Sequence, residues 1–220
     1  MVILLSVVLL SILFFLSRKL TRLLSHIFMR LFRSQSVTIH LLSFLFLPGV
    51  VLHELSHLLI ANLLLVPTGE VEFFPEIHGS EVKMGSVAIA RTDPLRRFLI
   101  GIAPLLGGIG LMLVASLYLF TTLFSLQSVL LFYIIFEIAN TMFSSSKDME
   151  GAIGFVVGVV AIGIILQLLG VPLSAGAMSI GHSIFLTAIL TRLSFFLFLA
   201  IGLDIFFVLL FEGLSRLRRH

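Results

Sequence analysis

Three residues with chemically useful side chains, His53, Glu54 and His57, form an H-E-x-x-H motif. On a helix, residues four apart lie on the same face, so the two imidazoles can converge on one cation. Glu54 follows His53 directly, and its carboxylate can reach a water on that cation rather than the cation itself. The spacing therefore predicts a zinc peptidase arrangement of two ligands and a general base.

The motif lies inside a long apolar segment. An ionised side chain in the middle of a membrane costs roughly 2.5–3.5 kcal/mol on insertion scales, and such groups are functional candidates by default. A motif without function on a solvent-exposed helix is the alternative, and the apolar surroundings argue against it. We interpret His53 and His57 as metal ligands and Glu54 as the catalytic base.

The third ligand remains open at this level. A catalytic zinc takes three protein ligands and keeps one open position. The chain has no cysteine, so the third ligand is a histidine or a carboxylate. The candidates are His26, His40, His182, His220, Glu137, Asp148, Glu150 and Asp204. Asp148 and Glu150 follow a Ser-rich break, where interrupted helix can line a cavity. Asp204 lies deep in the last apolar segment and could instead make a buried polar contact or pair with a basic residue.

The composition is that of a membrane protein. Of the 220 residues, 59% are hydrophobic and only 11% are charged, whereas about 25% are charged in soluble domains. We expect a multi-pass integral membrane protein of the cell membrane. The net charge of +3 comes from basic residues beside apolar segments, which indicates a lipid bilayer rather than nucleic acid as partner.

The elements that must position the motif are mostly helical. We expect an all-α polytopic fold with a small β-hairpin after the second span. About six spans are predicted, at 2–16, 41–66, 98–120, 126–143, 152–169 and 183–211. The last could be two shorter helices, which would give seven. Residues 2–16 lack the flanks of a cleaved signal peptide, and residues 17–38 predict a basic amphipathic helix at the interface.

Two further segments interrupt this helical pattern. Pro48-Gly49 predicts a kink or a new helix start just before the motif. Residues 67–97 are rich in charged and turn residues with partial alternation, which predicts a hairpin turning at Gly79-Ser80. An ordinary solvated loop is the alternative. The basic residues of 67–97, 144–151 and the C-terminal tail outnumber those of 17–38, so we expect those three segments in the cytoplasm.

The chain resembles the site-2 protease family of intramembrane zinc metalloproteases over residues 41–151. The likeness rests on HELSH in an early span, on the later segment NTMFSSSKD with its N-x7-D spacing, and on the polar, hairpin-like insert between them. The resemblance implies that Asp148 is the third zinc ligand beside His53 and His57. It also implies that Glu54 activates water and that Asn140 holds the substrate backbone or the developing oxyanion.

The segment around Asp148 departs from the family pattern. Ser144, Ser145 and Ser146 stand where the family commonly has proline, and Gly151 does not follow Asp148 directly. Glu150 is therefore a rival ligand. Glu137 is another, because some membrane metallopeptidases take a glutamate from a later helix.

These observations predict one membrane-embedded domain over 1–220. It comprises an anchor and amphipathic helix in 1–40, a catalytic core in 41–151 with the insert at 67–97, and C-terminal helices in 152–220. The expected activity is hydrolysis of transmembrane protein substrates by water activated on Zn2+. The alternatives are a non-catalytic metal-binding or transport protein and a pseudoprotease that binds transmembrane helices.

Overall fold

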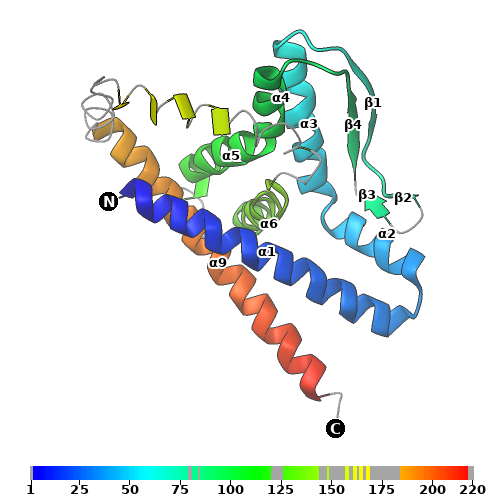
Figure 1. Cartoon of the computed structure of the whole chain (residues 1–220). Helices are drawn as coiled ribbons and strands as arrows, with labels where there is room; N and C mark the ends of the chain where they lie inside the picture. The colour runs from blue at the N-terminus through cyan, green and yellow to red at the C-terminus, as the bar shows by residue number, and fades with distance from the viewer. Residues whose placement is uncertain are drawn as a thin grey trace.

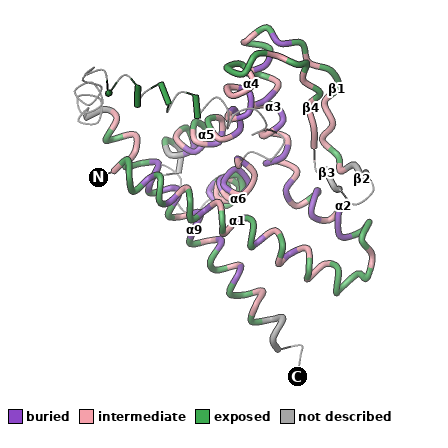
Figure 2. Tube along the Cα trace, viewed as in Figure 1, coloured by how far each residue is buried: buried purple, intermediate pink, exposed green. Residues whose placement is uncertain are grey.

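The computed structural model is mostly helical (Figure 1). It describes residues 2–78, 81–83, 85–119, 126–143, 148 and 184–217, together with the isolated pairs 157–158, 161–162, 164–165 and 167–168. Figure 2 shows that buried positions gather where the helices face one another, and that exposed positions lie on their outer sides.

The two longest helices, α1 (Val2–Phe32) and α9 (Ile184–Leu217), lie side by side (Figure 1). The buried residues of α1 recur every three or four positions and therefore form one face: Ser6, Leu9, Leu13, Ser17, Leu20 and Leu24. The predicted first span at 2–16 and the predicted amphipathic helix at 17–38 run together as one helix as far as residue 32. No glycine or proline interrupts residues 2–32, so the helix continues through its basic part.

Two helices that meet at a sharp bend carry the motif. Helix α2 (Gln35–Leu45) begins at Ser34, whose side chain accepts a hydrogen bond from the backbone N–H of Val37. Helix α3 (Leu47–Leu63) follows at an angle of 71°. Pro48 lies in the first turn of α3, where its missing N–H costs no intrahelical bond. The predicted break beside Pro48-Gly49 is confirmed, and the segment predicted as a span at 41–66 is divided between these two helices.

Three further helices surround α3. Helix α4 (Pro94–Gly101) starts at Asp93, whose side chain accepts a hydrogen bond from the backbone N–H of Arg96, and this bond lowers the pKa of the Asp93 carboxyl. Helices α5 (Ala103–Leu119) and α6 (Leu126–Thr141) both pack against α3. Gly107 of α5 lies against Ser56 of α3, and Gly108 lies against Met142, so these two glycines permit close helix packing.

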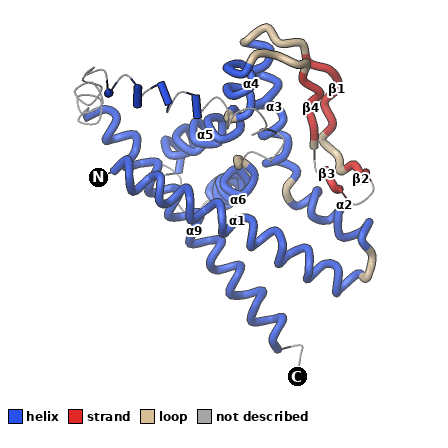
Figure 3. Tube along the Cα trace, in the orientation of Figure 1, coloured by secondary structure: helices blue, strands red, loops and turns tan. Residues whose placement is uncertain are grey.

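The segment between α3 and α4 forms two short antiparallel ladders (Figure 3), and strands β1 and β4 of the first ladder pack against α3. Strand β1 (Thr68–Glu72) pairs with β4 (Ser86–Ile89), and β2 (Glu76–His78) pairs with β3 (Glu81–Lys83). The predicted hairpin is confirmed, and the solvated-loop alternative is wrong. The proposed turn residues Gly79 and Ser80 lie outside the described residues, although the pairing of His78 with Glu81 brackets them.

Within the described residues, three helical segments are long and apolar enough to cross a membrane: Val2–Phe32, Pro94–Ala115 and Leu186–Gly213. The bent α2–α3 pair is a fourth if it counts as one span, while α6 is a shorter apolar helix. The six predicted spans are thus shown in part, and most of 152–169 lies outside the described residues. Helix α9 is unbroken through Arg192 and Asp204, so the alternative of two short helices is wrong.

Candidate metal centre

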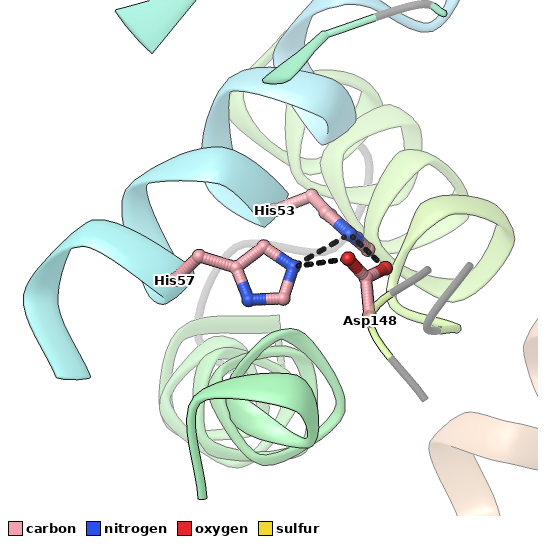
Figure 4. Close-up of side chains that lie close together, drawn as sticks. All are labelled: His53, His57 and Asp148. Atoms are coloured by element: carbon pink, nitrogen blue, oxygen red, sulfur yellow. Dashed lines mark hydrogen bonds and ion pairs between the residues drawn. The ribbon is translucent and has the colours of Figure 1, made fainter. Parts of the chain in front are cut away.

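The H-E-x-x-H helix and the segment after α6 bring three predicted ligands together (Figure 4). The Nε2 atoms of His53 and His57 lie 3.2 Å apart. The carboxylate of Asp148 lies opposite, with Oδ2 3.6 Å from Nε2 of His53 and Oδ1 3.4 Å from Nε2 of His57. One ligand atom from each residue falls within 4.8 Å of the others, so this group could hold a metal ion.

Backbone carbonyls fix the orientation of both imidazoles. Nδ1 of His53 donates to the carbonyl oxygen of Thr141 at 2.6 Å, and Nδ1 of His57 donates to that of Ile100 at 2.8 Å. A carbonyl oxygen can only accept, so each Nδ1 carries the proton. In the neutral imidazoles both Nε2 lone pairs therefore face Asp148, which is the tautomer that a metal ligand requires.

Asp148 reaches the histidines because α4 ends in a glycine. A Cβ atom on Gly101 would overlap the backbone carbonyl oxygen of Asp148. The carboxylate side chain is only one-fifth exposed. Helix α4 thus supplies both the carbonyl of Ile100 and the space for Asp148, so it braces two of the three candidate ligands.

Glu54 lies on the same helix, beneath the strands. Its side chain is only 8% exposed. A Cβ atom built on Gly85, just before β4, would lie 3.1 Å from Cγ and 3.2 Å from Oε1 of Glu54. The hairpin backbone therefore covers the predicted base and shields it from bulk solvent.

A pocket of about 200 Å³ adjoins two of the three candidate ligands. His57 and Asp148 line its metal-facing end, and Gly101 contributes from α4. Its other lining residues are Val87, Ile89, Ala90, Thr92, Arg97 and Ile100. The pocket thus joins the candidate metal centre to β4, and it could admit a peptide side chain beside the metal ligands.

Several predicted site residues lie elsewhere. Asn140 is on α6, but its amide donates hydrogen bonds to Phe136 and Asp204. Glu137 is fully buried on α6 and does not belong to the metal-ligand group found among the described residues. His26 and His40 lie on α1 and α2, outside that group. The rival ligands Glu150, His182 and His220 lie outside the described residues.

Sequence reasoning missed the groups that support the ligands. Thr141 and Ile100 act through backbone carbonyls, which every residue has, so no residue type marks them. Gly101 acts by having no side chain, so it offers no functional group that a sequence motif could include. The single sequence signal for it is its place between the Arg-rich start of α4 and the apolar α5.

The donor set indicates which ions would fit. Two neutral imidazole nitrogens and one carboxylate oxygen, with backbone carbonyls that accept from both imidazoles, form a set of three ligands that zinc accepts in proteins. The calcium and magnesium sites of proteins use oxygen ligands instead. No protein-family model, curated protein or solved structure matches this chain.

Proposed function

We propose that the chain is an intramembrane zinc endopeptidase that hydrolyses peptide bonds of transmembrane proteins. The observation that carries the proposal is the convergence of His53, His57 and Asp148 beside a buried Glu54. The convergence joins residues almost 100 positions apart, within a bundle in which three described helical segments are long and apolar enough to cross a membrane. The resemblance to the site-2 protease family supports the same assignment.

The residues present suggest how the reaction proceeds. A bound zinc ion would supply Lewis acidity, which lowers the pKa of water and polarises the scissile carbonyl. Glu54 accepts the proton of the attacking water and later passes it to the leaving amine. Thr141 and Ile100 keep Nδ1 of each histidine protonated, and the hairpin above Glu54 limits access of bulk water.

The substrate must be unwound, because a helix buries its peptide bonds in intrahelical hydrogen bonds. Among the described strands, β4 pairs with β1 alone, and residues of β4 line the pocket beside His57. We therefore place the unwound segment along β4 by strand addition. Replacing 70–90 by a flexible linker of equal length is expected to abolish cleavage while zinc content stays unchanged.

The deciding test compares wild type with Glu54→Gln. Both purified proteins are assayed for zinc and for cleavage of a transmembrane peptide in proteoliposomes. We expect bound zinc in both, and cleavage in wild type alone, because the amide cannot accept the proton of water. Zinc binding without wild-type cleavage of a panel of transmembrane peptides would favour a metal-binding protein or a pseudoprotease.

A further inference from the structure

A buried polar pair joins the last helix to the helix that supports the metal centre. Nδ2 of Asn140 on α6 donates to Oδ1 of Asp204 on α9 at 2.9 Å. Asp204 is fully buried, and it lies within the apolar segment Leu186–Gly213. A carboxylate at such a place is costly and is expected to have a specific use.

The neighbours of Asn140 determine which end of its amide faces them. Nδ2 also donates to the carbonyl oxygen of Phe136 at 3.0 Å. Both neighbours are acceptors, so the amino group must face them, and both of its hydrogens are used. The oxygen Oδ1 is buried without a partner among the described residues. Asn140 therefore has no N–H left for an oxyanion, which differs from the role that the family resemblance implies.

The pair lies one residue from a support of the metal centre. Thr141 follows Asn140 directly, and its carbonyl oxygen accepts the hydrogen bond from Nδ1 of His53. A shift or rotation of the last turn of α6 would move both groups together. Asp204 is on the buried face of α9, which packs against α6. The contact thus fixes the end of α6 from the side that holds Asn140.

We propose that Asp204 is a positioning residue for the metal centre. By holding Asn140, it fixes the last turn of α6, and this turn orients His53 through the carbonyl of Thr141. The inference rests on metal binding in the proposed function, but not on peptide hydrolysis. The proposal predicts that replacing Asp204 on α9 weakens binding of a metal ion, although the ion's ligands lie on α3 and in the segment after α6.

The test measures zinc affinity of the full chain in detergent by competition with a chelating dye. Asp204→Leu removes the oxygen that accepts the hydrogen bond from Asn140. We expect zinc affinity to fall about tenfold, at the low end of the losses seen when a group that orients a metal ligand is removed. Asp204→Asn retains an oxygen that can accept from Asn140, so it should stay near wild type. Equal losses in both variants would overturn the proposal, because the hydrogen bond would then be irrelevant.

A matched control lies on the same helix. The hydroxyls of Ser194 on α9 and Ser6 on α1 are hydrogen-bonded at 3.0 Å in a buried contact that does not involve α6. Ser194→Ala should leave zinc affinity unchanged. A loss as large as that of Asp204→Leu would mean that any damage to α9 acts on the site, and would overturn the specific role of Asp204.

Two further outcomes separate folding from positioning. If Asp204→Leu does not fold, the double variant Asn140→Leu/Asp204→Leu replaces both polar partners, an exchange that can be nearly neutral for stability. Its zinc affinity should still be reduced about tenfold, and wild-type affinity in this folded variant would overturn the proposal. A wild type that binds no zinc would instead defeat the proposed function itself.

Discussion

Nδ1 of His53 lies 2.6 Å from the carbonyl oxygen of Thr141, 88 residues further along the chain. This hydrogen bond joins the motif helix α3 to the end of α6, and the chain leaving α6 then leads to Asp148. The close approach of α3 and α6 is possible because Gly49 has no side chain. A Cβ there would overlap Oγ1 of Thr141 and lie 2.9 Å from the carbonyl oxygen of Glu137. The arrangement of the candidate metal ligands therefore depends on helix packing as much as on the motif.

The identity of the third ligand can be tested by removing each carboxylate in turn. Removing a group that only orients a metal ligand typically lowers metal affinity by roughly 10–100-fold. Asp148→Ala should lower zinc affinity by more than this, because it removes a direct ligand. Glu137→Gln should keep its zinc, since Glu137 does not belong to the ligand group. Zinc content of the purified proteins, measured by mass spectrometry, checks both. Loss of zinc in Glu150→Gln with retention in Asp148→Ala would reassign the ligand.

Gly101 should be required for metal binding although it touches no metal. In Gly101→Ala, the new methyl group would overlap the backbone carbonyl of Asp148. The Asp148 backbone must then move away from the histidines, so we expect zinc affinity to fall about tenfold or more. Isothermal titration of the apo-protein measures the change.

The control for Gly101 is a glycine in the helix that follows. A Cβ atom on Gly110 of α5 would meet nothing within 4 Å. Gly110→Ala should therefore leave zinc affinity unchanged, and it should stabilise α5 by up to about 1 kcal/mol through helix propensity. Equal zinc loss in both variants would contradict the role given to Gly101.

Gly85 should affect catalysis rather than metal binding. A methyl group there would lie 2.8 Å from Cγ1 of Val50 and 3.2 Å from Oε1 of Glu54. The hairpin, the Val50 side chain or the Glu54 side chain must shift in Gly85→Ala. Because a misplacement of about 1 Å can cost roughly 100-fold in rate, we expect cleavage of a transmembrane peptide to fall by about that factor while zinc is retained.

Gly69 on β1 provides the matched control within the same strands. Its nearest neighbour for a new methyl group is Cβ of Ala88, at 3.1 Å. Gly69→Ala therefore disturbs the β1–β4 pairing without touching Glu54, and cleavage should fall much less than in Gly85→Ala. If the two variants lose equal activity, the hairpin as a whole matters and contact with Glu54 does not.

Acid should weaken the start of α4. The hydrogen bond from the backbone N–H of Arg96 lowers the pKa of Asp93 in the folded chain, below its unfolded value of about 3.9. Its contribution to stability is therefore complete above pH of about 4 and is lost as pH falls through the lowered folded value. Asp93→Asn keeps the cap without this titration.

The measurement for Asp93 is a difference between two proteins, because other carboxylates also titrate. Thermal unfolding of wild type and Asp93→Asn is followed in detergent from pH 7 to pH of about 3. The melting-temperature difference should stay constant above pH of about 5 and change below about 4, with wild type losing more stability. Parallel curves over the whole range would show that Asp93 ionisation does not stabilise the fold.

Local patterns in the sequence predicted much of the fold. Pro48 cannot donate a backbone hydrogen bond, so the bend before α3 was readable from residue type alone. The turn-rich, partly alternating segment after α3 likewise predicted the strands. The sequence predicted a span at 2–16 and an amphipathic helix at 17–38, and the structure joins the two through residue 32, because basic residues do not end a helix that lacks glycine and proline. Polarity alone is a weak guide to where a helix stops.

The sequence by itself determined the membrane-like composition, the helical spacing of His53 and His57, and the candidate set for the third ligand. Helical periodicity and side-chain chemistry are local properties, and each residue carries them wherever the chain folds. Only the tertiary structure decided that Asp148, and not Glu137, lies beside the histidines, and that Asn140 is held by Asp204. Both contacts depend on how closely the helices approach one another. Gly49 and Gly101 permit the close approach because they have no side chain, and the carbonyl oxygens that orient the histidines belong to the backbone, so no residue type reveals them.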